Sequence, residues 1–140
     1  ASITITEHVI NCSVRPLVPY DWSIDKHRMD GLFTWNTSKV TLHLVDDQKN
    51  GKIISGDNLI IELQDRATLN ANVLDYLLAN PRLIPEEWKS KYIYFWGTIY
   101  RHNGRDSCVR ALCWSDNKWT DHYYWINGCY DSESPAAIAS

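Results

Sequence analysis

Side chains that could perform chemistry gather in the last third of this chain. His122 follows Asp121 and precedes Cys129, and a cysteine beside a histidine is a nucleophile–base pair in some enzymes. Nothing in the sequence orients this pair. No glycine-rich phosphate loop, His-Glu-x-x-His or Gly-x-Ser-x-Gly pattern is present. We therefore expect a binding protein that needs no cofactor rather than an enzyme.

Metal binding is also not expected. Four acidic residues of the same region could offer oxygen ligands to a hard cation, but they lack the spacing of a calcium loop and fit surface acids better: Asp116, Asp121, Asp131 and Glu133. The cysteines form no Cys-x-x-Cys pair, which disfavours zinc. Their even number permits two disulfides, but free thiols are favoured because nothing else indicates secretion. They are Cys12, Cys108, Cys113 and Cys129.

Charge and hydropathy exclude two kinds of partner. The net charge of −3 and the scattered lysines and arginines argue against a nucleic-acid ligand. No apolar run is long enough for membrane insertion. No charged-then-apolar leader is visible, so the default expectation is a cytoplasmic protein, although a leader removed before Ala1 stays open.

The 140 residues suit one domain, and the alternation of apolar residues predicts an α+β fold. Strands are expected at 2–11, 32–35 and 40–44, with an irregular stretch before Gly31. Ser55 or Asp57 caps a first helix, and Asn70 or Asn72 caps a second that ends at Pro81. A brief helix begins at Pro85.

The C-terminal part reads as an antiparallel sheet. Residues 92–100 form the strongest predicted strand, and two more follow at 108–114 and 119–126. Asn103-Gly104 and residues 115–118 are the expected hairpin turns. The architecture is thus a single domain with central helices and a C-terminal antiparallel sheet.

Residues 102–134 have an unusual composition. Asn, Asp, Ser, Tyr, His, Cys and Gly fill 21 of these 33 positions, against 34 of the first 101. Such mixtures of adaptable polar groups and rigid amphipathic rings are typical of antibody loops. A polar, aromatic hairpin with no binding role has a similar composition, so this reading stays open beside that of a recognition surface.

The sequence resembles a family of small proteins from uncultured bacteria. The resemblance rests on residues 69–89, which begin Leu-Asn-Ala-Asn-Val-Leu-Asp-Tyr-Leu-Leu, and on Phe95-Trp-Gly-Thr-Ile-Tyr-Arg101; residues 8–12 and 38–40 fit it too. Members share this part, differ sharply between fixed tryptophans after it, and end in Pro-Ala-Ala, here Pro135–Ala137. That pattern is similar to the variable proteins of diversity-generating retroelements.

The resemblance implies a mechanism of variation and a scaffold. In those systems an error-prone reverse transcriptase randomises adenines in a template copy, and the altered residues are displayed on a C-type-lectin-like fold. Asparagine codons randomised at adenine cannot encode Trp, Lys, Glu, Gln or Met. Within 102–134 the unreachable residues are Trp114, Lys118, Trp119, Trp125 and Glu133. No Glu-Pro-Asn or Trp-Asn-Asp triplet is present, so calcium-dependent sugar binding is not expected.

We therefore predict a constant scaffold (1–101), a variable segment (102–134) and a C-terminal tail (135–140). Trp96 is the expected core anchor, and an apolar frame should pack inward: Val109, Leu112, Trp114, Trp119, Trp125 and Ile126. The predicted ligand-contacting residues are His102, Asn103, Asp106, Ser107, Ala111, Cys113, Ser115, Asp116, Asn117, Thr120, Asp121, His122, Tyr123, Tyr124, Asn127, Gly128, Cys129, Tyr130, Asp131 and Ser132. The predicted partner is a protein or another macromolecule.

Two other functions remain open from the sequence. A carbohydrate-binding, lectin-like module would expose some of the late tryptophans as a platform. An interaction protein of the immunity or inhibitor type would instead have one fixed acidic surface and a single tight partner. Fold analogy alone does not decide among these.

Overall fold

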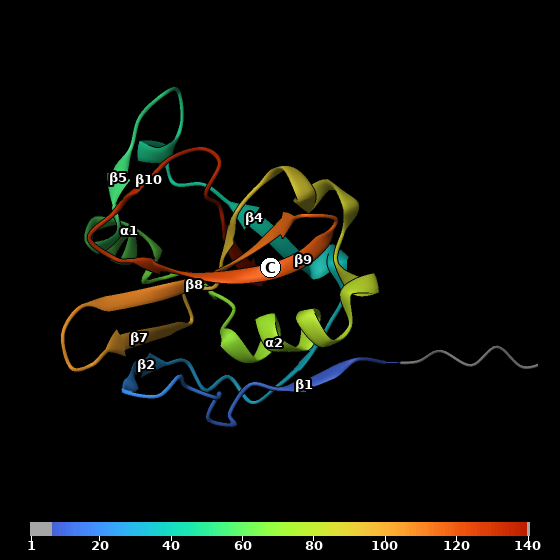
Figure 1. The fold of residues 1–140 in the computed structure, drawn as a ribbon. Coiled ribbons are helices and arrows are strands. Elements are labelled where there is room, and N and C mark those ends of the chain that lie inside the picture. Colours follow the sequence, from blue (N-terminus) through green and yellow to red (C-terminus); the bar gives the residue numbers. More distant parts are fainter. Residues whose placement is uncertain (1–6, 140) are drawn as a thin grey trace, which may run out of the picture.

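The computed structural model describes residues 7–139 and shows a small single-domain α+β protein with two helices and a curled mixed sheet (Figure 1). The main sheet contains β2 (Trp22–His27), β4 (Val40–His43), β6 (Ile93–Tyr94), β7 (Thr98–His102), β8 (Ser107–Ser115), β9 (Lys118–Trp125) and β11 (Ala136–Ala139). Two further antiparallel pairs join β1 (Val9–Asn11) to β3 (Leu32–Thr34) and β5 (Ile54–Ser55) to β10 (Cys129–Tyr130).

Strand β8 is the hub of the main sheet. One edge pairs with β9 along its whole length, from Cys108 opposite Trp125 to Ser115 opposite Lys118. The other edge pairs first with β7 and then with β6. Strand β2 pairs with the outer edge of β7. Strand β11 pairs with β6 in a parallel orientation and with β4 in an antiparallel orientation. Most of the predicted variable segment is therefore the β8–β9 hairpin.

Each helix begins where the sequence places a cap. The Ser55 hydroxyl accepts from the Asn58 N–H at the start of α1 (Gly56–Leu63). The Asn70 side chain accepts from the N–H groups of Asn72 and Val73 at the start of α2 (Ala71–Ala79). Short 3-10 helices span Thr37–Lys39, Asp46–Gln48, Pro81–Leu83 and Glu86–Ser90.

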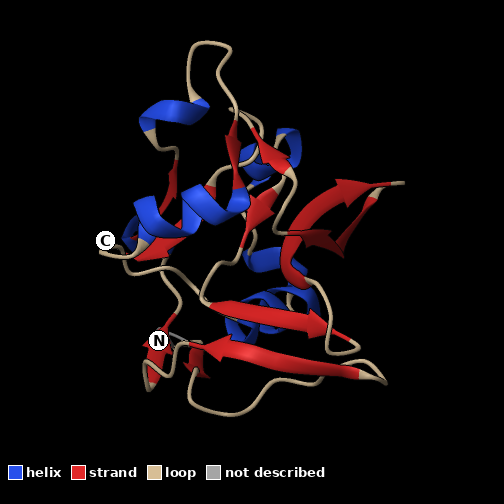
Figure 2. Ribbon diagram, turned by 90° about the vertical axis from the view of Figure 1, so that its left-hand side faces the viewer, coloured by secondary structure: helices blue, strands red, loops and turns tan. Residues whose placement is uncertain are grey.

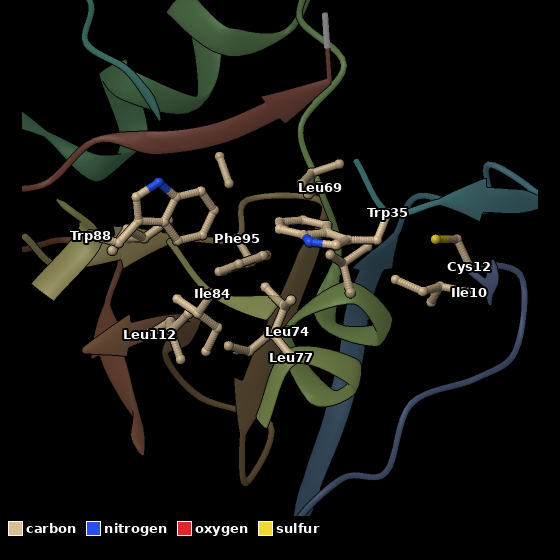
Figure 3. Packing of buried hydrophobic residues seen from close by; sticks show 13 residues of the cluster. Ile10, Cys12, Trp35, Leu69, Leu74, Leu77, Ile84, Trp88, Phe95 and Leu112 are labelled. Atoms are coloured by element: carbon tan, nitrogen blue, oxygen red, sulfur yellow. The ribbon is translucent and has the colours of Figure 1, made fainter. Parts of the chain in front are cut away.

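The two helices lie on opposite faces of β8 (Figures 1 and 2). Because side chains of a strand alternate between its faces, β8 contributes residues to the hydrophobic cluster of each helix. Leu112 packs into the cluster that holds α2, together with Trp35 and Trp88, whose rings meet edge to face at 6.0 Å (Figure 3). Val109 and Ala111 point the other way, into the cluster that holds α1.

The structure confirms both helix caps, the brief helix after Pro85 and the two turns. Asn103, Gly104, Asp116 and Asn117 all have positive φ, as a tight hairpin turn requires. Of the strand expected at 2–11, residues 9–11 are a strand; residues 2–6 lie outside the described part of the chain. The expected strands at 32–35 and 40–44 are present with slightly shorter bounds.

The prediction of one strand over residues 92–100 was wrong. The segment forms two strands, β6 and β7, which are separated around Gly97, and the Gly97 N–H donates to the Leu69 carbonyl. A Cβ on Gly97 would lie 2.8 Å from the Cα of Asn70. The strand is therefore interrupted where its backbone approaches that of residues 69–70 too closely for a side chain.

Two further expectations need correction. The stretch before Gly31 was expected to be irregular, but residues 22–27 form β2. The expected tail at 135–140 contains β11, which lies between β4 and β6 in the sheet, with Ala136 and Ala137 buried. Short alanine-rich sequences carry little strand signal, so only pairing on both edges makes this segment a strand.

No helix within residues 7–139 is long and apolar enough to cross a membrane.

Candidate functional site

The predicted ligand-contacting residues divide into three groups by exposure. The side chains that face solvent belong to Asn103, Asp106, Ser115, Asp116, Asn117, His122, Asn127, Cys129 and Asp131. Half-buried ones are His102, Ser107, Thr120, Asp121, Tyr123, Tyr124, Gly128 and Ser132. The exposed and half-buried groups together extend from the end of β7, along the β8–β9 hairpin, to the residues that follow β10.

Three predicted contact residues are buried, so for them the prediction was wrong. Ala111 packs in the cluster that holds α1, and Cys113 points to the same face of β8 by strand alternation; they are 0% and 3% exposed. Tyr130 is 2% exposed and packs its ring against Tyr94 and Trp96. Their composition resembled that of a binding surface, but strand alternation and the β5–β10 pairing turn them inward.

The predicted inward frame is correct for its aliphatic members and wrong for Trp125. Val109, Leu112 and Ile126 are buried, whereas the Trp125 ring is 46% exposed. Trp114 and Trp119 are half-buried and pack on each other with ring centroids 5.4 Å apart. Trp96 is buried, as predicted for a core anchor.

A hollow of about 610 Å³ opens between the end of β9 and the loop before β11. Most of its lining comes from residues 124–134, and Tyr92 and Tyr94 complete the wall. Tyr124 packs against both of these tyrosine rings, with centroids at 6.4 and 5.4 Å. The surface offered by the hollow is therefore aromatic, with polar groups of Asn127, Asp131 and Glu133 at its border.

Three phenols of this hollow, those of Tyr94, Tyr124 and Tyr130, are neutral hydrogen-bonding groups. Burial raises the pKa of Tyr94 and of Tyr130 well above the ordinary value; neighbouring phenols raise the pKa of Tyr94 further, and the nearby Cys108 and Cys129 thiols raise that of Tyr130. Burial also raises the pKa of Tyr124. Neutral rings beside the carboxylates of Asp131 and Glu133 suit a cationic or aromatic group of a ligand.

The loop that borders the hollow is held through its backbone. The buried amide of Gln48 donates to the carbonyls of Asp131 and Ser134, at 3.1 and 2.9 Å, and its oxygen accepts from the Val45 N–H. The Lys91 ammonium donates to the Ser132 carbonyl at 3.3 Å. These bonds are independent of which side chains the loop residues carry.

The first residue of helix α1 hydrogen-bonds to the backbone between β9 and β10. The Gly56 N–H donates to the Gly128 carbonyl at 3.2 Å, and a Cβ on Gly56 would collide with the carbonyl oxygen of Ile126. The Tyr130 hydroxyl donates to the Trp125 carbonyl at 2.6 Å. Main-chain contacts of Gly56 and the buried side chain of Tyr130 therefore fix the path along which the loop leaves β9.

The half-buried carboxylate of Asp121 is paired with a buried guanidinium rather than free. Its carboxylate accepts two hydrogen bonds from the buried Arg110, at 2.9 and 2.8 Å, and Asp75 pairs with the same guanidinium at 2.8 Å. Burial lowers the pKa of Arg110, but the hydrogen bond and charge of Asp75, with Tyr100 and Asp121, outweigh it and raise the pKa overall. Free exchange of Asp121 is therefore not expected.

A second aromatic group lies on the α2 side of the hairpin. The Trp22 ring packs at 4.7 Å from both His102 and Tyr123, and His102 contacts the exposed Trp125 at 5.8 Å. Tyr123 also meets Tyr100 edge to face. Both faces of β9 thus present rings that are partly open to a partner.

The structure gives no support to chemistry at His122 and Cys129. The His122 ring packs on Tyr124, while Cys129 sits in β10 opposite Ser55, and no hydrogen bond joins the two. Residues 7–139 contain no cluster of three or more His, Cys, Asp or Glu side chains arranged for a metal ion. All four cysteines are free thiols, as the sequence favoured, and only Cys129 is exposed.

Sequence reasoning missed the residues that hold the site. Gln48 was not singled out, and Tyr92 and Tyr94 were assigned to a strand with no link to residues 124–134. Their hydrogen bonds and contacts span tens of positions in the chain, and no local pattern reports such a separation.

Comparison with known proteins found no matching family model, no similar curated protein and no similar solved structure.

Proposed function

We propose that this protein recognises a macromolecular ligand through a diversified surface on residues 102–134, as the variable proteins of diversity-generating retroelements do. Residues 7–101 and β11 supply the scaffold, for which we propose a C-type-lectin-like relationship. Recognition uses shape, hydrogen bonding and aromatic contact, without covalent chemistry.

The observation that carries this proposal is that the loop after β9 is held by hydrogen bonds to its backbone carbonyls. Gln48, Lys91 and Gly56 bind carbonyl oxygens of Gly128, Asp131, Ser132 and Ser134. A carbonyl is the same in every residue, so side chains at Asn127 and Cys129 can change while the loop keeps its path, and a change at Asp131 removes one local hydrogen bond, the one its carboxylate accepts from the Glu133 N–H. A surface meant to vary needs such an arrangement.

The surface itself has the character of a recognition site. The exposed positions combine Asn, Asp, Ser and His with the partly open rings of Tyr92, Tyr124 and Trp125. Rigid rings lose little entropy on binding, and small polar groups adapt their hydrogen bonds to different partners. The hollow provides the concave element into which one group of a ligand can be buried.

The nucleotide sequence of the locus tests this function directly. We expect a nearby reverse-transcriptase gene and a second, near-identical copy of the 3′ coding region that differs at adenines. A locus with neither feature would contradict diversification.

A library of variants tests the same idea in the protein. Randomising His122, Asn127, Cys129 and Asp131 together should leave most members folded, because these exposed side chains make few contacts that hold the loop. The matched library randomises Gln48, Val109, Ala111 and Tyr130, which are buried, and should be mostly unfolded. Equal losses in the two libraries would count against the proposal.

Carbohydrate binding is the second candidate, and the exposed ring of Trp125 favours it. Sugars stack on such rings, and His102 lies beside this one. A glycan array separates the two functions: a single glycan class lost on Trp125→Ala indicates a lectin-like module, whereas no glycan binding leaves the variable-surface proposal as stated.

A further inference from the structure

We propose that the free edge of β9 binds an extended, basic segment of a partner polypeptide as an additional antiparallel or parallel strand. This inference rests on the proposed function and specifies the ligand of that surface. It assigns affinity to the main chain of β9 and selectivity to the side chains on either side of it.

The alternation of hydrogen bonds shows which groups of β9 face outward. The Ile126 N–H bonds to the Ser107 carbonyl, and Lys118 lies opposite Ser115 across a two-residue turn. In an antiparallel pair every second residue bonds to its neighbour, so Lys118, Thr120, His122 and Tyr124 bond to β8. The N–H and C=O groups of Trp119, Asp121 and Tyr123 therefore point away from the sheet.

Those outward groups have no partner within residues 7–139. The one outward carbonyl of β9 that is bonded belongs to Trp125, which accepts from the Gly128 N–H and the Tyr130 hydroxyl. Between Trp119 and Tyr123 the edge offers a repeating set of donors and acceptors, which is the pattern that an added strand completes.

The other edges of the main sheet are protected and this one is not. Strand β2 has an irregular register between Ile24 and Lys26, and β4 has four residues. Bulges and short length are devices that prevent pairing with other chains. In contrast, β9 has eight residues in unbroken register, contains no proline, and is rich in tryptophan and tyrosine.

Charge selects a basic partner. Residues 116–133 carry four carboxylates and one lysine, and two of these carboxylates, Asp116 and Asp131, take part in no salt bridge within the described chain. On the face that carries Thr120, His122 and Tyr124, a long side chain of the added strand would stand beside the aromatic hollow. Lysine and arginine suit such rings through cation–π contact.

A second copy of this chain is a poorer occupant of the edge. Its own β9 would bring Tyr123 and Tyr124, whose rings are already packed on Trp22, Tyr100, Tyr92 and Tyr94. It would also bring the same acidic character to both sides of the interface. A foreign segment with free basic side chains meets neither objection.

The test uses the full chain and three synthetic peptides. The first, acetyl-Thr-Lys-Val-Lys-Val-Lys-Thr-amide, alternates basic and apolar residues; the second has Glu for Lys; the third is the first with its central amides replaced by esters. Binding is followed by NMR titration at millimolar peptide. We expect the basic peptide to bind, the acidic peptide not to bind, and the ester analogue to bind at least about tenfold more weakly because it lacks the N–H donors.

Amide exchange supplies a readout that only strand addition produces. With the basic peptide bound, the amides of Trp119, Asp121 and Tyr123 should become protected, while those of Thr120 and His122 are protected already in the free protein. Substitution of one exposed residue on the edge supplies the matched variants: H122K should weaken binding of the basic peptide about threefold and H122E should strengthen it about threefold.

Each other outcome overturns the inference. The inference is wrong if the basic peptide does not bind at millimolar concentration, or if the ester analogue binds equally well. It is also wrong if amide protection along β9 does not alternate, or if the protein forms a dimer paired through β9 without peptide. The diversified surface would survive these results, because the locus and the two variant libraries test it separately.

Discussion

The side-chain amide of Gln48 lies 3.1 Å from the backbone carbonyl oxygen of Asp131, across 83 positions of the chain. Gln48 is 1% exposed, yet its partner residue has an exposed side chain. A buried, fully bonded amide thus holds the main chain at Asp131 while the Asp131 side chain stays in solvent. This relationship separates the stability of the fold from the composition of the surface.

Replacing Gln48 by Ala should lower the free energy of unfolding by about 2–4 kcal/mol, because it leaves the Ser134 carbonyl and the Val45 N–H without partners, removes one of the two donors to the Asp131 carbonyl and opens a cavity. Urea denaturation measures this loss. Asn127→Ala is the control in the same loop; its side chain is exposed, so we expect a change within about 0.5 kcal/mol. Equal effects of the two substitutions would contradict the claim that Gln48 holds the loop through hydrogen bonds to its backbone.

Replacing Asp121 by Ala should cost about 2–3 kcal/mol, because the buried Arg110 loses two charge-assisted hydrogen bonds and retains only Asp75 as an acidic partner. A double-mutant cycle with Arg110→Met isolates the interaction between the two residues. Additive effects in that cycle would show that the pair is not coupled.

Substitutions at the buried Trp96 and at Trp125, which lines the hollow, should separate stability from binding. Trp96→Ala should destabilise the protein by about 3–5 kcal/mol because the ring is buried against Tyr94 and Tyr130. Trp96→Phe should cost less, since the indole N–H has no hydrogen-bond partner to lose. Trp125→Ala should change stability by about 1 kcal/mol or less and alter ligand binding instead. Thermal melts of the three variants check the order.

The thiols should make the protein less stable at high pH. Burial, with a smaller contribution from a nearby aspartate, raises the pKa of Cys12 and of Cys108 to about 11 from 9.0. Because the folded-state pKa is the higher one, this stability is complete below about pH 9 and is lost as the pH rises towards 11. Urea midpoints at pH 7.5 and 10 measure the loss.

The matched variant for that measurement replaces Cys12 and Cys108 by Ala, and its urea midpoint should fall less between the two pH values. In the native protein at pH 8 a thiol reagent should modify Cys129 alone, since the other three thiols are buried. Fast modification of more than one thiol would contradict the burial of the remaining cysteines.

Local chemistry in the sequence determined the elements of this protein that depend on neighbouring residues. Ser55 and Asn70 cap their helices because a side-chain oxygen reaches N–H groups two or three residues away. Asp116-Asn117 turns the chain because both residues tolerate positive φ. The β8–β9 hairpin, and with it the accessible positions His122 and Asn127, could therefore be predicted from sequence.

Only the tertiary structure decided which residues of the segment are accessible to solvent and what supports them. Strand alternation predicts two faces of β8, but the position of α1 makes the face of Ala111 and Cys113 an interior one. Gln48, Gly56 and β11 gain their roles from contacts with residues distant in the chain. A pattern within a short window carries no information about such pairings, since their energies arise from burial and from hydrogen bonds that exist only after the chain has folded.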